Sequence, residues 1–232
     1  MIKAIIFDLD NTLVNFWKMK TMSMEAATFA MRDAGLRMPK EKVNKIFEDI
    51  YHEFGTEYDL VFQEFLKKSM GKIDWKILAN AIVGYRKMQS SHLEPYPGVM
   101  STLIKLKEQG IKLGIASDAP RLRGWLRLVT MRLDPFFDAI VFFEDTKKLK
   151  PDREPFMKAL RQMGIGPKDA MMVGDHFERD IVGAKKLGML SCHAKYGHIE
   201  GWSGKLVKGC EPDYEISYID QLLKIVEKEN SR

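Results

Sequence analysis

The sequence is poor in the features that mark secreted, disulfide-stabilised or membrane proteins. Its 232 residues include only two cysteines, Cys192 and Cys210, which are not spaced as a C-x-x-C pair. A chain of this size does not need a disulfide, so we expect a reducing environment. No stretch approaches the ~20 apolar residues of a membrane span, and the N-terminus lacks the pattern of a cleavable signal. We therefore predict a cytoplasmic protein without a membrane partner.

Several nucleotide-binding and hydrolytic signatures are also absent. There is no Walker A loop, no G-x-G-x-x-G fingerprint, no internal repeat and no low-complexity segment. Gly114-x-x-Ser117 does not match the G-x-S-x-G elbow of serine hydrolases. The net charge of +5 and the pI near 9.0 favour anionic substrates without requiring nucleic acid, so we predict no nucleic-acid partner.

The most informative stretch is residues 3–14, where a short apolar run stops at two carboxylates and a threonine, Asp8, Asp10 and Thr12. Such a run predicts a strand buried on both faces. Ligands of open α/β sheets bind outside the carboxyl ends of the strands, and acids two residues apart point to the same side. A calcium loop is excluded because Leu13 and Met19 stand where that loop needs glycine and glutamate.

Residues 15–94 carry helical patterns only. We predict one helix from about residue 17 to 35, a second opened by Pro39, a third stopped by Gly71 and a fourth capped by Asp74. Their apolar residues recur at helical spacing and are interpreted as core, including Trp75, Leu78, Ile82 and Tyr85 of the fourth helix. Four helices with no intervening strand predict a helical insert.

After the turn-rich segment 94–98, apolar strand patterns alternate with helices. The predicted strands are 111–117, 139–143, 170–173 and 190–194; the predicted helices are 98–109, 121–133, 153–163, 177–187 and a last one from 219. Alternation of this kind predicts a parallel sheet with helices on both faces. The expected fold is therefore α/β, with a doubly wound, Rossmann-like core formed by residues 1–14 and 95–232 and a small all-helical domain, residues 15–94, inserted after the first strand.

Polar residues follow each predicted strand at the same edge of the sheet. They are Asp8, Asp10 and Thr12; Ser117 and Asp118; Lys147, Lys148 and Lys150; and Asp175 with Asp180. Like charges so close cannot all ionise without compensation, and a hard divalent cation such as Mg²⁺ is the natural compensation for carboxylates. A lysine and a serine hydroxyl at such an edge suit the oxygens of a phosphate group.

These motifs resemble those of the haloacid dehalogenase-like hydrolase superfamily. The resemblance rests on Asp8-Leu9-Asp10-Asn11-Thr12-Leu13, on Ser117, on Lys150-Pro151 and on Gly174-Asp175 followed by Asp180, in this order. It covers the whole chain and implies that the helical insert is a cap domain between the first and second motifs.

The resemblance also implies roles for these residues. Asp8 would be the nucleophile that forms an aspartyl-phosphate, and Asp10 the general acid and then the general base. Mg²⁺ would be bound by the Asp8 carboxylate, the Asp10 backbone carbonyl and Asp175, with Asp180 either as a ligand through water or as an orienter of Lys150. Lys150 fits the family pattern better than Lys147 or Lys148. Thr12, Ser117, Asp118 and Arg121 are the candidate substrate-binding residues.

The predicted activity is Mg²⁺-dependent hydrolysis of small phosphorylated metabolites, such as sugar, glycolate or glyceraldehyde phosphates. The acid at Asp10 favours this activity over carbon–halogen or carbon–phosphorus cleavage, because members with those activities lack it. Two alternatives stay open: a phosphomutase of sugar phosphates and a receiver-like phosphoacceptor module. We expect a monomer or a homodimer.

The sequence allows more than one role for His176 and for the arginines of the predicted helix 121–133. His176 can point into the site or cap the helix that follows it. Four arginines recur along helix 121–133 beside an apolar stripe, namely Arg121, Arg123, Arg127 and Arg132. We interpret them as a solvated basic face, with Arg121 kept as a possible phosphate contact.

Overall fold

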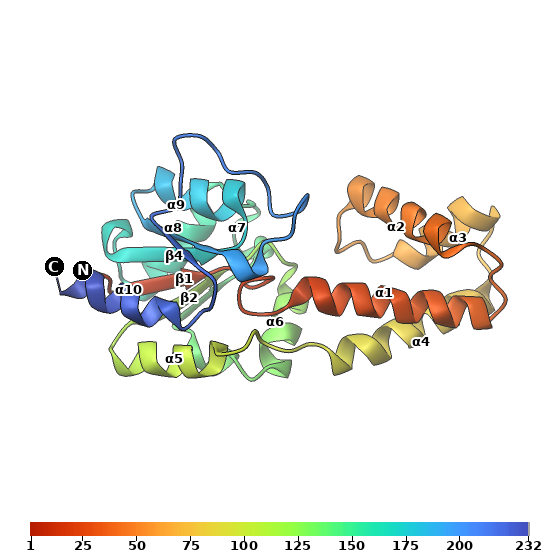
Figure 1. The fold of residues 1–232 in the computed structure, drawn as a ribbon, viewed down its shortest axis with the longest axis horizontal. Coiled ribbons are helices and arrows are strands. Elements are labelled where there is room, and N and C mark those ends of the chain that lie inside the picture. Colours follow the sequence, from red (N-terminus) through yellow and green to blue (C-terminus); the bar gives the residue numbers. More distant parts are fainter. Residues whose placement is uncertain (232) are drawn as a thin grey trace. The chain divides into compact units, whose positions relative to one another are not determined.

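In the computed structural model, which describes residues 1–231, the chain divides into two compact units (Figure 1). One unit is formed by Met1–Trp17 with Glu94–Arg232, and the other by Lys18–Leu93. We call the first the α/β unit and the second the helical unit.

The α/β unit is built on one parallel sheet in the order β3-β2-β1-β4-β5-β6. The strands are β1 (Ala4–Phe7), β2 (Lys112–Ala116), β3 (Ala139–Val141), β4 (Ala170–Gly174), β5 (Leu190–Ala194) and β6 (Tyr214–Ile216). All four residues of β1 are buried, as expected for an inner strand covered on both faces. The predicted Rossmann-like parallel sheet is confirmed. The three-residue edge strand β6 was not predicted, since it is too short and polar to give a pattern.

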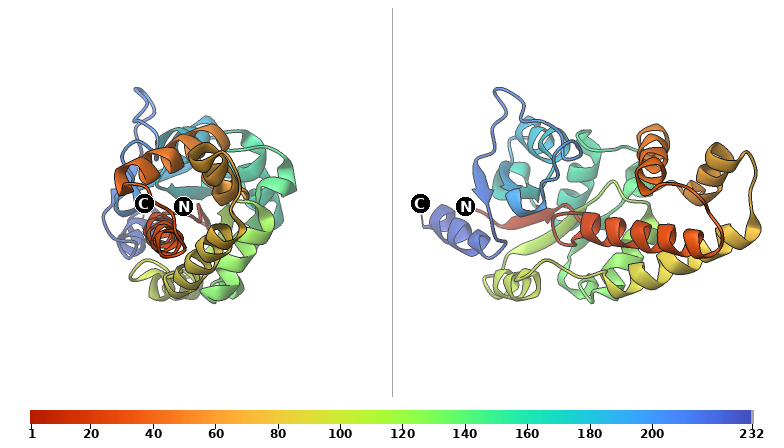
Figure 2. Two further views of the ribbon diagram at one scale, coloured as in Figure 1. Left: turned by 90° about the vertical axis from the view of Figure 1, so that its right-hand side faces the viewer. Right: turned by 45° about the vertical axis from the view of Figure 1, so that its right-hand side comes forward.

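Helices cover both faces of this sheet. Figures 1 and 2 show α5 (Val99–Glu108) and α10 (Gln221–Asn230) on one side, with α8 (Arg153–Met163) and α9 (Val182–Lys186) on the other. On the second side Phe156 and Leu160 of α8 share a buried cluster with Ile6 and Met172 of the sheet. This unit also contains α6 (Arg121–Thr130), the single turn α7 (Phe143–Thr146) and several shorter helical turns, among them η3 (Phe177–Ile181), which leads into α9. None of the helices within residues 1–231 is long and apolar enough to cross a membrane.

Helix α6 has the opposite orientation from the one predicted. Its buried face contains Gly124 and Arg127, and three of its apolar side chains are more than half exposed: Leu122, Leu126 and Val129. The reason is the contact with Phe142, whose ring approaches so closely that a Cβ on Gly124 would lie 2.0 Å from it. Only the glycine face of the helix can make this contact. The interpretation of Arg127 as part of a solvated basic face was therefore wrong.

The helical unit contains most of α1 (Phe16–Asp33), with α2 (Lys40–Phe54), α3 (Val61–Met70) and α4 (Trp75–Ser91). Aromatic packing dominates its core, where the rings of Phe47 and Phe65 stack with centroids 4.4 Å apart. The Asp74 carboxylate caps α4 by accepting from two backbone N–H groups. Trp75 was predicted to lie in the core but is 74% exposed, because it occupies the first turn, beyond the stripe that packs.

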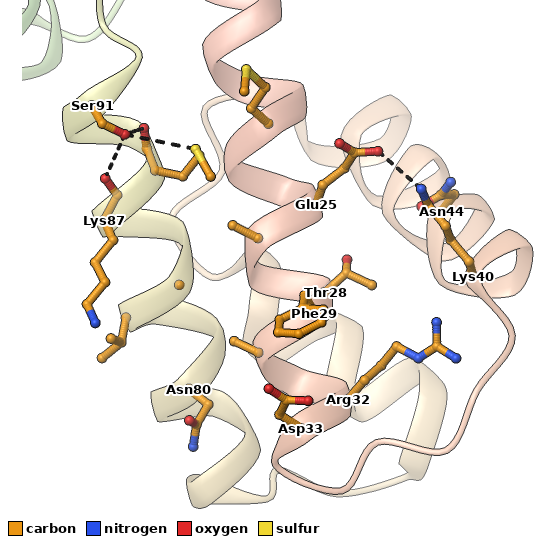
Figure 3. A pocket seen from close by; sticks show the side chains of 16 residues that line it. Glu25, Thr28, Phe29, Arg32, Asp33, Lys40, Asn44, Asn80, Lys87 and Ser91 are labelled. Carbon is orange, nitrogen blue, oxygen red and sulfur yellow. Dashed lines mark hydrogen bonds and ion pairs between the residues drawn. The ribbon is translucent and has the colours of Figure 1, made fainter.

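Helices α1 and α4 run side by side in both figures, and they approach closely at Gly84, where a Cβ would lie 2.8 Å from the Ala26 carbonyl oxygen. Outside this contact they form, with α2, an open groove of about 860 Å³ (Figure 3). Its lining combines the exposed Phe29 with charges of both signs, including a Glu25–Lys40 ion pair at 3.1 Å. Among residues 1–231, the three-acid cluster with metal-ligand geometry lies in the α/β unit and not in this groove.

Candidate active site

The turn after β1 carries Asp8 and Asp10 and is fixed from two sides. Asn11 adopts a left-handed conformation at φ 56°, which asparagine tolerates better than most residues, and its side-chain oxygen accepts from the Trp17 N–H at 2.9 Å. From the other side Gly197 packs on the Asn11 carbonyl so closely that a Cβ would lie 1.5 Å from the oxygen. Only glycine fits at position 197, and these two contacts fix the backbone conformation of the turn.

Lys150 joins two of the predicted acids. Its Nζ lies 2.7 Å from Asp8 Oδ1 and 2.7 Å from Asp180 Oδ1, and all three side chains are buried. Burial by itself disfavours the ammonium, but the carboxylates of Asp180 and Asp8 outweigh it and raise the pKa of Lys150 above its usual value. Lys147 and Lys148 are exposed. The structure thus brings Lys150, of the three candidate lysines, into contact with the acids.

Asp8, Asp175 and Asp180 form a buried cluster in which one oxygen of each lies within 4.8 Å of the others. Burial raises the pKa of Asp8, although Lys150 opposes this shift. Burial also raises the pKa of Asp175 well above its ordinary value, and the charges of Asp8 and Asp180 add to the effect. When all three carboxylates are ionised, the single ammonium leaves an excess of two negative charges, and this repulsion is what the raised pKa values of Asp8 and Asp175 reflect in part.

The excess of negative charge in this cluster suits a divalent cation. A divalent cation cancels two negative charges, and Mg²⁺ is bound by carboxylate oxygens in sites of this kind. The donor set of Asp8, Asp175 and Asp180 is all oxygen and fits a hard cation. The side chain of Asp10 does not belong to this cluster, because its Oδ2 accepts a hydrogen bond from Arg127. Of Asp10, only the backbone carbonyl is therefore a candidate metal ligand.

Asp180 is positioned by the turn that follows β4. Its Oδ2 accepts from the His176 N–H at 3.1 Å, and a Cβ on Gly174 would lie 2.2 Å from the same oxygen. Glycine is therefore required at the end of β4. His176 caps the turn through Nδ1, which accepts from the Arg179 N–H, and burial together with the charges of Arg179 and Lys150 lowers the pKa of His176 to about 3. The structure thus places His176 as a neutral capping residue.

Asp175 is held by a loop that gave no signal in the sequence. The buried Ser203 hydroxyl donates to Asp175 Oδ2 at 2.5 Å, and His193 Nε2 lies 3.2 Å from the Asp175 carbonyl oxygen. Ser203 also accepts from the Ile199 N–H and so closes its own loop. A lone serine in a glycine-rich segment has no motif, and only the fold brings it to the acid.

Asp10 forms an ion pair with Arg127, a residue that sequence analysis missed as a site residue. Arg127 Nη1 lies 2.6 Å from Asp10 Oδ2, and the arginine side chain is only 7% exposed. The guanidinium also packs over the Phe16 ring, 4.5 Å from its centroid. The spacing of Arg127 three residues after Gly124 was the available signal, because both belong to one helix face.

The four candidate substrate-binding residues differ in burial and in their distance from the acidic cluster. Ser117 is buried at the end of β2, where its Oγ accepts from the Ala119 N–H, and the buried Thr12 hydroxyl has no hydrogen-bond partner among residues 1–231. Asp118 positions the backbone of Lys150, because its Oδ1 accepts a hydrogen bond from the Lys150 N–H at 2.9 Å. Arg121 is half exposed and pairs with Asp145, so it is not brought to the cluster.

A buried acidic cluster with a lysine, at the carboxyl end of the central strand of a parallel sheet, defines a hydrolase site that suits a phosphate group and a divalent cation. The chain belongs to the haloacid dehalogenase-like hydrolase family, whose sequence model matches residues 5–194. The predicted family membership is confirmed.

Curated relatives cover nearly the whole chain. It is 33% identical over 226 residues to a glyceraldehyde 3-phosphate phosphatase of Methanocaldococcus jannaschii, covering 97% of each chain. It is 31% identical over 229 residues to the pyrophosphatase PpaX of Halalkalibacterium halodurans, again covering 97% of each. Among solved structures, the magnesium-bound Bacillus subtilis protein YfnB superposes with a TM-score of 0.71 at 20% identity, covering 97% of this chain and 99% of that one. The protein is thus an enzyme of the phosphatase type.

Proposed function

We propose that this protein is a Mg²⁺-dependent phosphatase of small phosphorylated metabolites, which acts through an aspartyl-phosphate on Asp8. The observation that carries the proposal is the buried cluster in which Lys150 joins Asp8 to Asp180 at 2.7 Å beside Asp175. Burying so many charges costs several kcal/mol per ion, and such sites are typical of active sites.

In the first step a carboxylate oxygen of Asp8 attacks phosphorus, and the bond from phosphorus to the ester oxygen breaks. The leaving oxygen takes a proton from Asp10. In the second step Asp10 takes a proton from a water molecule, whose oxygen attacks phosphorus and breaks the bond to Asp8, which releases inorganic phosphate. One carboxylate thus serves as general acid and then as general base.

The other residues of the site hold the reacting groups. Lys150 keeps Asp8 oriented and places a positive charge beside the oxygens of the transferred group. Ser117, at the neighbouring strand end, offers a hydroxyl to another phosphate oxygen. A bound Mg²⁺, held by Asp8, Asp175, Asp180 and the Asp10 backbone carbonyl, would neutralise charge on the phosphate oxygens.

We assign a cap function to the inserted helical domain, residues 15–94. The two proposed steps share one site, and exclusion of bulk water protects the phosphorylated enzyme between them. The helical unit is compact by itself, and the chain connects it to the α/β unit at two points only, which suits such a role. The substrate would then be selected by side chains of this domain.

Glyceraldehyde 3-phosphate is the first candidate substrate because the relative from Methanocaldococcus jannaschii is named a glyceraldehyde 3-phosphate phosphatase. Pyrophosphate is the second, because PpaX is named a pyrophosphatase. The test is phosphate release from a panel of these two compounds, glycolate and sugar phosphates and an aryl phosphate, each with Mg²⁺ or with a chelator. Asp8→Asn is the matched inactive variant, since it keeps the size of the side chain and removes the nucleophile.

We expect Mg²⁺-dependent phosphate release that is lost in Asp8→Asn. Release that persists in Asp8→Asn contradicts the proposed nucleophile. An isomerised sugar phosphate in place of free phosphate supports the phosphomutase instead, and a stable phosphorylated Asp8 without turnover supports the phosphoacceptor module.

A further inference from the structure

We infer that Arg127 is a positioning residue that holds the carboxylate of Asp10 in place for its work as general acid and base. The inference rests on the proposed function and concerns a residue that no motif marks. It follows from the burial of the arginine, its ion pair with Asp10 and the orientation of helix α6.

The ion pair connects two parts of the chain that are 117 residues apart. Arg127 Nη1 meets Asp10 Oδ2 at 2.6 Å, the distance of a strong charge-assisted hydrogen bond. The guanidinium also packs over the Phe16 ring, 4.5 Å from its centroid. Phe16 is itself 6% exposed, so the arginine has little freedom to move.

Helix α6 directs the arginine to this place at a cost. Three of its apolar residues, Leu122, Leu126 and Val129, are left more than half exposed, while Arg127 shares the buried face with Gly124 and Leu128. Burying a guanidinium is unfavourable unless it is paired, and a leucine at this position would pack without that penalty. The orientation of the helix therefore favours the contact with Asp10 over hydrophobic burial.

A fixed carboxylate is what the chemistry of Asp10 requires. A general acid must lie within hydrogen-bond reach of the leaving oxygen, and a misplacement of about 1 Å costs on the order of 10²-fold in rate. The Asp10 side chain is 22% exposed and lies on a turn, so the contact with Arg127 narrows the range of rotamers that it samples. A planar guanidinium restricts these rotamers more strongly than a lysine does.

The test uses two phosphate esters that differ in their need for an acid. A simple alkyl phosphate requires protonation of its leaving oxygen, whereas 4-nitrophenolate leaves without a proton. We expect Arg127→Met to lower kcat/KM for the alkyl ester on the order of 10²-fold and to change that for 4-nitrophenyl phosphate less than about 3-fold. Methionine fills the volume of the arginine stem, so a loss of packing alone is small. Arg161→Met, at an exposed arginine of α8 paired with Glu154, is the control and should leave both values unchanged.

Two further variants decide between positioning and a structural role. In the Asp10→Asn background, Arg127→Met should cost no additional kcat/KM for the alkyl ester, because its partner is already disabled. Arg127→Lys should recover part of the loss. An equal loss for both esters, or additive losses in the double variant, would overturn the inference while leaving the phosphatase intact. If the unmodified enzyme releases phosphate from neither ester, the proposed function fails and the inference fails with it.

Discussion

The α/β unit and the helical unit bury different kinds of side chain. The core of the helical unit is aromatic and aliphatic, and within residues 18–93 the one charged side chain that is buried is Lys20. Lys20 is satisfied locally, since its Nζ donates to the Thr56 carbonyl and lies over the Tyr51 ring. The α/β unit instead buries five charged side chains that lie in or beside the acidic site, namely Asp8, Asp175, Asp180, Arg127 and Lys150.

This difference separates stability from function. Apolar burial stabilises the helical unit by roughly 25 cal/mol per Å². Buried charges of the α/β unit at best offset their own desolvation, and they repel one another where three carboxylates meet. Substitutions in the first core should therefore change the free energy of unfolding. Substitutions in the acidic cluster should change activity, binding and pH dependence, and they should lower stability as well where they leave a buried charge unpaired.

The largest effect is expected for Lys150→Met. Removing the ammonium leaves Asp8 and Asp180 without their common partner, so activity should fall on the order of 10³-fold and unfolding free energy by about 3 kcal/mol at neutral pH. Phosphate release and urea unfolding measure the two effects. Lys148→Met, at an exposed lysine two residues away, is the matched control. Equal behaviour of the two variants would contradict the central place given to Lys150.

Phe65→Ala tests the other core. Phe65 is fully buried and stacks on Phe47, so we expect a loss of about 3–5 kcal/mol in unfolding free energy. Urea denaturation followed by circular dichroism gives this value. Phe29→Ala, at a side chain that is 68% exposed, should cost less than about 0.5 kcal/mol. A small loss for Phe65→Ala would mean that the aromatic stack does not stabilise the helical unit.

Mg²⁺ should stabilise the protein by mass action. At a concentration 100-fold above its Kd, a ligand of the folded state alone adds about 2.7 kcal/mol. The melting temperature should therefore rise and saturate with Mg²⁺ in the unmodified protein, and this rise should be absent in Asp175→Asn. The same rise in both proteins would show that any stabilisation by Mg²⁺ arises outside the acidic cluster.

The smallest effect concerns a structural acid far from the cluster. Partial burial disfavours the charged form of Asp213, but hydrogen bonds from Lys185 and Ser191 outweigh it and lower its pKa below 3.8. A lowered pKa stabilises the fold above the ordinary value, and this stabilisation is lost as the pH falls through the lowered one. We expect Asp213→Asn to cost about 1 kcal/mol at pH 7 and progressively less below about pH 4. A cost that does not change with pH would contradict this origin.

The acidic cluster was open to prediction because Asp8 and Asp175 each follow an apolar strand directly. Parallel strands end at one edge, so Asp8 and Asp175 had to meet once β1 and β4 were neighbours. Lys150 was separated from Lys147 and Lys148 only by the family pattern, and its contact with Asp8 depends on a loop that no periodicity describes. The helices of residues 15–94 were recognisable from spacing and caps for the same local reasons.

The other partners of the acids, Arg127 and Ser203, follow no strand end and belong to no motif, so the sequence gives at most a weak signal for them. Arg127 looks like any arginine of an amphipathic helix, and its burial depends on the contact between Gly124 and Phe142. Ser203 reaches Asp175 from a loop without a pattern. Such contacts arise from tertiary packing, which overrides the preference of each segment.

The most direct test of the phosphatase mechanism is a search for phosphorylated Asp8 in Asp10→Asn. This variant keeps the nucleophile but lacks the base that hydrolyses the intermediate, so an aryl phosphate with Mg²⁺ should leave the enzyme phosphorylated. After an acid quench, mass spectrometry of peptides should find one phosphoryl group on Asp8, and none in the Asp8→Asn Asp10→Asn double variant. An active unmodified enzyme whose Asp10→Asn variant carries no phosphoryl group on Asp8 would contradict the mechanism.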